Sequence, residues 1–208
     1  MKTQSKKVSN LPGYLVIVSL IAFSSLSLAA LAMPEASSTS TNTMIDDFED
    51  VTNNAFGIPR QFLNDTVAGG KTTTELNVAE GVMHLKGKIE PPRGQPGWAS
   101  TALILDPQGQ PLDASEFEGI RLLVKVNSGN ISISANSIEV TNFDYHTAQV
   151  VVAPDGNFHE VKVPFDSMKR AWSEQTSLNT KTINGVSIVA FDLQKANFDY
   201  SVDEVSFY

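Results

Sequence analysis

The stretch Glu118–Asn127 (EGIRLLVKVN) alternates between apolar and polar side chains with a period of two residues. Such alternation is typical of a β-strand that buries one face and exposes the other to water. The same pattern recurs in Gly81–Glu90 and, beyond turns rich in glycine, asparagine and aspartate, along most of the later chain. From Met44 onward no stretch has the apolar spacing of a helix, so the sequence predicts an all-β fold.

Two later stretches predict how strands lie within their sheets. Ile183–Leu193 has apolar residues at both its even and its odd positions, so both sides of the strand are apolar. This predicts a central strand with both faces covered. In Phe198–Tyr208 the apolar parity switches between Val202 and Val205, which predicts a β-bulge at Asp203–Glu204. About nine or ten short strands separated by turns favour a jelly-roll β-sandwich.

The composition is that of one globular domain that folds without disulfides. The chain has 208 residues, no cysteine, and 15 lysines and arginines against 23 acidic residues, a formal net charge of −8. The absence of cysteine excludes thiolate metal sites and cysteine nucleophiles. Nucleic acids are not expected as partners, because phosphate binding needs clustered lysines and arginines that this acidic chain lacks.

The N-terminus has the three parts of a secretory signal peptide, assigned to residues 1–32. Lysines precede the apolar stretch Tyr14–Phe23, and the small residues of Ala30–Ala32 form a cleavage site. The alternative is an uncleaved membrane anchor, because Tyr14–Leu31 is nearly long enough to span a bilayer. We expect an exported protein, periplasmic or secreted, whose only membrane contact would be an uncleaved signal segment.

Removal of residues 1–32 takes away three lysines and no acidic residue. The mature chain then has 12 basic and 23 acidic residues, a formal charge of −11. Residues 33–43 are rich in serine and threonine, which predicts a flexible linker. Residues 44–208 are predicted to form the folded domain.

Motifs that carry well-known catalytic chemistries are missing from the chain. It has three histidines and contains no G-x-S-x-G elbow, H-E-x-x-H pair or P-loop. Its many carboxylates form no motif that selects the facing pair of a glycosidase. We therefore expect a protein that is not an enzyme and acts by binding.

Loops and aromatic residues provide the candidates for a binding site. Two long connections, Val51–Lys71 and Ser167–Thr182, are of the kind on which a sandwich builds binding surfaces, and the second is expected to hold a short helical turn near Met168–Trp172. Exposed aromatic rings stack on sugars or anchor protein partners, although buried packing is an equally good interpretation for Trp98. The predicted ligand-binding residues are Asn64, Asp65, Trp98, Tyr145 and Trp172.

Several local patterns along Met44–Tyr208 resemble the CIA30 family, which is named for a mitochondrial factor associated with an assembly intermediate of respiratory complex I. The most specific pattern is Asn64–Gly70 (NDTVAGG). The family's order also includes an opening segment before this pattern, Asp46–Glu49 (DDFE). Two further segments come after it, Gly97–Ser100 (GWAS) and Val163–Phe165 (VPF). The resemblance implies a galactose-binding-like β-sandwich.

The resemblance also implies a protein-binding or assembly-type role. The alternative is a carbohydrate-binding module of the bacterial envelope, because such modules share this type of sandwich and the DDFE opening. An enzyme of unrecognised type is the third alternative. The chain departs from the family at Lys71, near which a serine is usual, and at Asn127–Asn130 (NSGN), where a Gly-Asp-Gly-Arg type of turn is usual.

Acidic residues near both ends of the domain form a candidate metal site. In sandwiches of this type the first and last strands commonly lie side by side, so Asp46, Glu49 and Asp203 could converge on a structural Ca²⁺. The alternative is that these carboxylates flank strand ends and face water, because no loop has the alternating Asp/Asn spacing of a calcium site. No other cofactor is expected.

Overall fold

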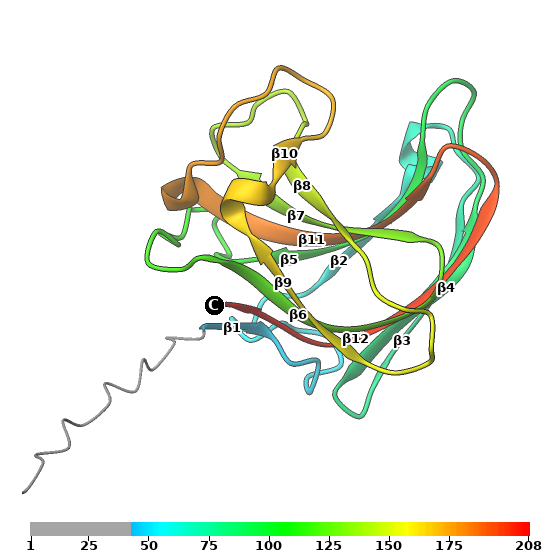
Figure 1. Ribbon diagram of the computed structural model, residues 1–208, viewed down its shortest axis with the longest axis horizontal. Helices are drawn as coiled ribbons and strands as arrows, with labels where there is room; N and C mark the ends of the chain where they lie inside the picture. The colour runs from blue at the N-terminus through cyan, green and yellow to red at the C-terminus, as the bar shows by residue number, and fades with distance from the viewer. Residues whose placement is uncertain (1–42) are drawn as a thin grey trace, which may run out of the picture. The chain divides into compact units, whose positions relative to one another are not determined.

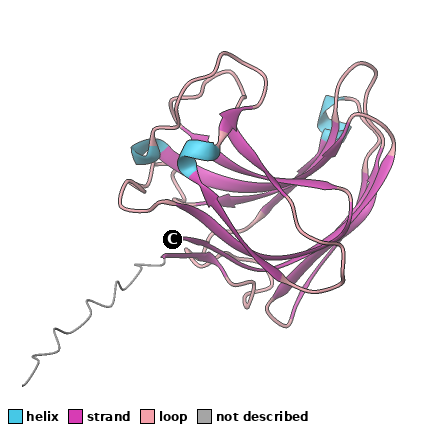
Figure 2. Cartoon of the chain, in the orientation of Figure 1, coloured by secondary structure: helices cyan, strands magenta, loops and turns pink. Residues whose placement is uncertain are grey.

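Two antiparallel sheets of six strands each form the structure, a computed structural model that describes residues 43–208 (Figure 1). The predicted signal peptide, residues 1–32, and all of the predicted linker except Thr43 lie outside the described residues. Strands and loops make up nearly all of the described chain (Figure 2), which confirms the prediction of an all-β sandwich. In that part of the chain the helical segments are three short 3₁₀ turns, and no helix is long and apolar enough to cross a membrane.

The first sheet consists of β1 (Thr43–Asp46), β3 (Thr73–Ala79), β4 (Val82–Ile89), β6 (Gly119–Ser128), β9 (His159–Pro164) and β12 (Ala196–Phe207). Its strand order is β3-β4-β12-β6-β9. Strand β12 pairs with β4 through its first part and with β1 through its last residues. The first and last strands of the domain therefore lie side by side, as expected from the sequence.

The second sheet consists of β2 (Gln61–Asn64), β5 (Gly97–Ile104), β7 (Asn130–Ser137), β8 (His146–Val150), β10 (Lys169–Arg170) and β11 (Ile183–Asp192). Its strand order is β10-β8-β7-β11-β5-β2. Strand β11 lies between β7 and β5, and buried residues occupy both of its faces from Gly185 to Ala190. The structure thus has the central strand that the sequence predicts.

The hydrophobic core lies between the two sheets and follows the alternation of each strand. Strand β6 contributes Ile120, Leu122 and Val124 from the first sheet. Strand β11 contributes Val186 and Ile188 from the second sheet. Burial of this apolar surface is the main contribution to the stability of a domain without disulfides.

Strand β12 contains the predicted bulge. Its pairing with β6 shifts register between Val202 and Glu204. Val202 and Val205 are both fully buried, because the extra residue Asp203 returns the strand to its inward parity.

Several connections carry the chain from one sheet to the other. The turn Asn127–Asn130 joins β6 of the first sheet to β7 of the second. Gly129 has a φ of 92°, and a Cβ at this position would lie 2.7 Å from the Cβ of Phe198. The sharp crossing between sheets therefore requires glycine at this position.

The connection after β9 differs from the prediction of a helical turn near Met168–Trp172. A 3₁₀ turn, η2 (Phe165–Ser167), comes earlier, and the Ser167 hydroxyl donates to the backbone oxygen of Pro164 at 2.7 Å. Lys169 and Arg170 instead form β10, which pairs with β8. Pairing with β8 thus holds Lys169 and Arg170 in an extended conformation, so they do not form the helical turn.

Candidate functional site

One face of the second sheet points away from the core. In β7, Ile131 and Ile133 belong to the core, so the alternate residues Ser132 and Ser134 point to the opposite side. In β11, Val189 is buried but is not part of the core, because it alternates with the core residues Ile188 and Ala190 and so points to the other side of the sheet. We call this opposite surface the free face. By strand register its residues are Trp98, Ser100 and Ala102 on β5, Ser187, Val189 and Phe191 on β11, Ser132, Ser134 and Asn136 on β7, and Thr147 and Gln149 on β8 with Tyr145 just before it.

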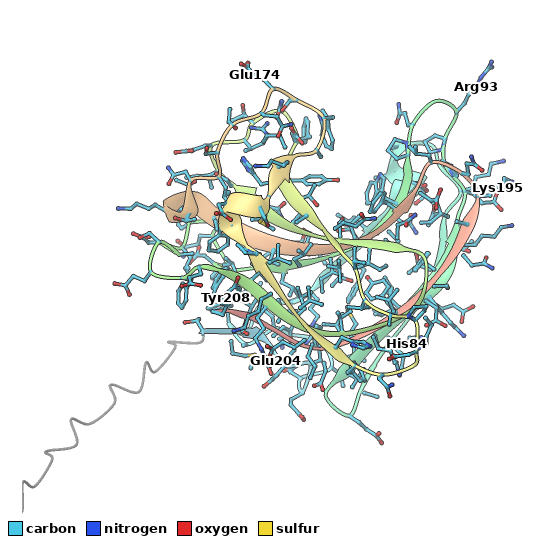
Figure 3. The ribbon with its side chains drawn as sticks, viewed as in Figure 1. His84, Arg93, Glu174, Lys195, Glu204 and Tyr208 are labelled. Atoms are coloured by element: carbon cyan, nitrogen blue, oxygen red, sulfur yellow. The ribbon has the colours of Figure 1, made fainter. Side chains whose placement is uncertain are left out.

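Loops rise beyond both ends of the strands that form the free face (Figure 1). Residues 90–97 rise at one end, and residues 138–145 and 171–178 rise at the other. Figure 3 shows Arg93 and Glu174 at the tips of two of these loops. The free face therefore extends from one group of loops to the other.

The middle of the free face is lined by hydroxyl and amide groups. The Ser134 hydroxyl donates to Thr147 Oγ1 at 3.1 Å, and Asn136 Nδ2 donates to Ser187 Oγ at 2.9 Å. Ser187 acts as an acceptor in this bond, so its hydroxyl proton remains available to a ligand. These side chains are short, so a ligand can approach the sheet closely.

Trp98 and Phe191 lie at one end of the free face as cross-strand neighbours on β5 and β11. Beneath them the buried Asp65 carboxylate accepts hydrogen bonds from the Trp98 amide at 3.3 Å and from the Thr72 hydroxyl at 2.7 Å. The Asn64 side chain accepts from the Thr66 amide at 3.1 Å and caps the 3₁₀ turn η1 (Asp65–Ala68).

Asn64 and Asp65, two of the predicted ligand-binding residues, form hydrogen bonds within the protein. Asp65 is fully buried, and its oxygens are used by protein donors. Asn64 is committed to its own turn and to the Thr72 backbone oxygen, to which its Nδ2 donates at 3.2 Å. Asp65 supports Trp98 from below through the Trp98 amide, whereas Trp98 itself lies half-buried on the free face.

Tyr145 and Trp172 come together at the other end. Their ring centroids are 5.2 Å apart in an edge-to-face arrangement with an interplanar angle of 85°. Trp172 is 60% exposed, and the Ala171 amide donates to the Tyr145 backbone oxygen at 3.2 Å. Of the five predicted ligand-binding residues, these two form an aromatic pair, in which Trp172 keeps an exposed ring surface on which a sugar can stack.

The buried Asp144 carboxylate holds the aromatic pair in place. Its Oδ1 accepts from the backbone amides of Tyr145 at 2.8 Å and Ala171 at 3.0 Å. Its Oδ2 accepts from Arg170 Nε at 2.9 Å, from the Ser173 amide at 3.1 Å and from the Ser173 hydroxyl. Asp144 thereby fixes the backbone on both sides of Trp172.

The ionisation of Asp144 is part of this arrangement. Burial opposes the charged form, but hydrogen bonds from Ser173, the Tyr145 amide and Arg170 outweigh it and hold the pKa of Asp144 well below its usual range. Burial, and then the charge of Asp144, raise the pKa of Tyr145. At neutral pH the site therefore contains a charged carboxylate beneath a neutral phenol.

Further contacts hold the loop that carries Trp172. The Arg170 backbone amide donates to Gln175 Oε1, and Gln175 Nε2 donates to the Arg170 backbone oxygen, both at 3.0 Å. His146 Nε2 lies 2.8 Å from the backbone oxygen of Thr176. Phe143, beside Asp144, is 93% exposed and has a φ of 62°, a strained conformation for a bulky residue and one that often marks a functional loop.

A cavity of about 640 Å³ lies elsewhere along the same connection. Its apolar lining comes from Phe117, Phe165, Met168 and Leu178. None of the five predicted ligand-binding residues lines it. The cavity is therefore separate from the aromatic groups on the free face.

Asp46, one of the three predicted calcium ligands, lies in a buried ion pair. Arg60 Nε and Nη2 donate to the two carboxylate oxygens of Asp46 at 2.6 and 2.7 Å, and both side chains are fully buried. The oxygens that a cation would need are thus occupied by a guanidinium group. Among residues 43–208 no group of three acidic, histidine or cysteine residues is placed to hold a metal, so Asp46, Glu49 and Asp203 do not act together.

The three histidines have structural partners. His84 Nε2 lies 3.0 Å from Asp199 Oδ1, and His159 Nε2 lies 2.9 Å from Asp155 Oδ1. The partner of His146 is the backbone oxygen of Thr176. Within residues 43–208 none of these imidazole bonds goes to a serine or threonine hydroxyl, as the base of a nucleophilic triad would require.

Sequence reasoning missed the hydroxyl groups of the free face and the role of Asp144. The alternation of serine with isoleucine in Asn130–Ser137 (NISISANS) contains the signal for the former, because it places the serines on one face. No pattern in the sequence marks Asp144, since all of its donors except the Tyr145 amide come from residues that are distant along the chain.

Comparison with protein families finds one match. The CIA30 family model, described as complex I intermediate-associated protein 30, matches residues 58–202. Curated protein sequences show no match to the chain.

Solved structures share the sandwich. The family 11 carbohydrate-binding module of the cellulosomal cellulase Lic26A-Cel5E of Clostridium thermocellum has a TM-score of 0.57 and 20% identity, over 80% of this chain and 93% of that chain. A family 11 module from Clostridium thermocellum in complex with a β-1,3-1,4-mixed-linked tetrasaccharide has a TM-score of 0.56 and 20% identity, over 80% and 94%. The agarase AgWH50C has a TM-score of 0.54 and 12% identity, over 80% of this chain and 24% of the agarase. At these identities the likeness is one of fold.

Proposed function

This chain belongs to the CIA30 family, and from that premise we propose that it is a non-catalytic carbohydrate-binding module. The observation that carries the proposal is the free face, where hydroxyl and amide groups lie between aromatic side chains at both ends. A sugar ring offers an apolar face to an aromatic ring and hydroxyl groups to polar side chains. The free face provides both kinds of partner.

The rigidity of the aromatic pair supports this proposal. Asp144 and Arg170 hold the backbone around Tyr145 and Trp172 before any ligand arrives. A preorganised site loses less conformational entropy on binding. The fold shared with family 11 modules supports the same class of ligand, and one of those modules was solved with a tetrasaccharide.

Calorimetric titration with soluble polysaccharides tests the proposal. We expect Trp172→Ala to weaken binding at least tenfold, which corresponds to about 1.4 kcal/mol, because it removes an exposed stacking surface. Phe158→Ala is the matched control, since Phe158 packs against Lys125 of the first sheet, 5.0 Å from Lys125 Nζ to the ring centroid. Equal affinity in the Trp172→Ala variant and the unmodified protein would contradict a sugar site at this position.

A protein-binding, assembly-type role is the second candidate. The family takes its name from association with an intermediate of complex I, and Phe143 and Trp172 expose apolar surface on neighbouring loops. If no polysaccharide binds and Phe143→Ser abolishes capture of a specific protein from an envelope extract, this role replaces the carbohydrate role.

Export is part of the proposed function, because extracellular or periplasmic polysaccharides would then be accessible. The support is the pattern of residues 1–32. N-terminal sequencing of the protein purified from its native host should give Met33 as the first residue. Recovery of the intact chain in the cytoplasmic fraction would contradict export.

A further inference from the structure

The aromatic groups of the free face lie at opposite ends of its strands. Trp98 pairs with Phe191, which in turn pairs with Asn130 of β7. At the other end, His146 pairs with Ala135 of β7, so Tyr145 lies level with the next residue of β7, Asn136. Along β7 the two levels are thus six residues apart, from Asn130 to Asn136.

This register gives the length of the path between the aromatic groups. Six residues along a strand span about 20 Å, and the three strand spacings from β5 to β8 span about 14 Å. The diagonal from Trp98 to Tyr145 is therefore about 25 Å. A single sugar ring cannot contact both ends of such a path.

The floor of the path consists of small side chains. Ser132, Ser134 and Ser187 are buried residues between the two ends, and Thr147 lies beside Ser134. Ser132, Ser187 and Thr147 keep some exposed surface and are the polar partners along the path, whereas Ser134 is 1% exposed and bonds to Thr147. An extended ligand can therefore lie close to the strands and exchange hydrogen bonds with them along its length.

Charge is distributed unequally between the outer faces of the two sheets. The outer face of the first sheet has ion pairs, with Lys86 Nζ 3.1 Å from Glu75 Oε2 and Arg121 Nε 2.7 Å from Glu160 Oε2. The residues that define the free face include no lysine, arginine, aspartate or glutamate. Lys169 of the edge strand β10 pairs with Thr147 and so lies at the margin of this face, as the one charged residue that the strand pairings of the second sheet place there.

We infer that the ligand of the free face is an uncharged polysaccharide whose chain runs diagonally across the second sheet, from Trp98 to the Tyr145–Trp172 pair. The inference rests on the proposed carbohydrate-binding function and specifies its substrate class. A carboxylate or sulfate on the ligand would lose water over the middle of this face without gaining a cationic partner. Sugar hydroxyls find donors and acceptors there.

Matched pairs of polysaccharides test the absence of charge. The probes are hydroxyethyl cellulose with carboxymethyl cellulose, and agarose with chemically sulfated agarose, each pair sharing a backbone but differing in charge. The neutral member of at least one pair should bind at least tenfold more tightly than its charged counterpart. Its affinity should change less than about twofold between about 0.05 M and 0.5 M NaCl, and Lys169→Gln should leave it unchanged.

The two tryptophans of the chain test the extended path, because they lie at its two ends. Trp172→Phe leaves Trp98 as the only tryptophan, and Trp98→Phe leaves Trp172. A hexasaccharide of the bound polysaccharide should change the fluorescence of both single-tryptophan variants. A disaccharide should change at most one of them and should bind at least tenfold more weakly.

The outcomes separate the two proposals. Equal binding of neutral and charged polysaccharides, or equal affinity for disaccharide and hexasaccharide, would overturn the inference and leave carbohydrate binding intact. Binding of no polysaccharide, neutral or charged, would overturn both. Since phenylalanine preserves the aromatic packing at either position, loss of folding is not expected to obscure the result.

Discussion

The buried carboxylate of Asp65 shows how single atoms support the free face. Asp65 accepts hydrogen bonds from the amide and hydroxyl of Thr72 and from the amide of Trp98. Gly70 leaves room for it, because a Cβ at that position would lie 2.2 Å from the Asp65 Cγ. Gly70 of the NDTVAGG segment thus makes room for a buried hydrogen-bond network beneath Trp98.

Gly70→Ala is expected to lower the free energy of unfolding by about 2–3 kcal/mol, because the new methyl group displaces the Asp65 carboxylate from its donors. Gly69→Ala is the matched control. Gly69 has a φ of 86°, but no atom would lie within 4 Å of a methyl group added there, so only backbone strain of about 1 kcal/mol is expected. Urea unfolding measures both, and equal losses would contradict the steric explanation.

Asp144 is expected to make stability depend on pH in the acidic range. Its folded-state pKa is lowered, so its contribution is fully present above the unfolded pKa of about 4 and is lost as the pH falls toward the folded value. Asp144→Asn should cost about 2–3 kcal/mol at neutral pH and should flatten the loss of stability below about pH 4. Thermal unfolding across this range measures the effect. Parallel curves for the two proteins would argue against it.

At the scale of elements, a buried ion pair rather than a cation fastens the start of the domain. Arg60 reaches from the connection after β1 back to Asp46, and its Nη1 also donates to the Asp50 backbone oxygen at 2.8 Å. The guanidinium carbon lies 4.8 Å from the centroid of the Phe48 ring. One side chain thereby joins β1 to the segment that leads into β2.

Arg60→Ala is expected to lower the free energy of unfolding by about 3–5 kcal/mol, because it leaves the Asp46 carboxylate buried without its partner. Arg60→Lys should lose less, since it keeps the charge but not the two parallel hydrogen bonds. Chemical denaturation of both variants gives the comparison. A neutral effect of Arg60→Ala would mean that Asp46 finds another donor or becomes exposed.

The same pairing predicts that a chelator has no effect on stability. Melting with and without EDTA should give the same midpoint, because Asp46 is already neutralised by Arg60. Differential scanning fluorimetry is sufficient for this measurement. A lower midpoint in EDTA would restore a structural role for a bound cation.

Elements with a regular period were predictable, and elements created by contacts were not. The alternation of Glu118–Asn127 and the parity switch in β12 are local properties of the chain, so the sequence predicted both the strand and the bulge. Strand β10 is only two residues long and exists because it pairs with β8. A strand of two residues is too short to show a periodic pattern in the sequence.

At the scale of the whole molecule, the two sheets are most protected at their centres. Strand β11 is paired on both sides in the second sheet, and β12 holds the same position in the first. Edge strands such as β3 and β2 have one free side and exposed residues. Protection from hydrogen exchange follows burial and pairing of this kind.

Hydrogen exchange measured by mass spectrometry should therefore be slowest in peptides from β11 and β12 and faster by at least about tenfold in β2 and β3. Addition of a bound polysaccharide should slow exchange around Tyr145 and Trp172. It should leave the outer face of the first sheet unchanged. Uniform exchange over all strands would contradict a stability that decreases from the central strands to the edges.

Local periodicity in the sequence determined the all-β class, the central strand and the bulge, because alternation records which side of a strand is buried. Composition and motifs determined the family resemblance and the aromatic candidates Trp98, Tyr145 and Trp172. Only the tertiary structure decided that Tyr145 and Trp172 touch, that Asp65 is buried, and that Asp46 pairs with Arg60. Those contacts depend on strand pairing and loop packing between segments distant along the chain, which the period of any one segment does not specify.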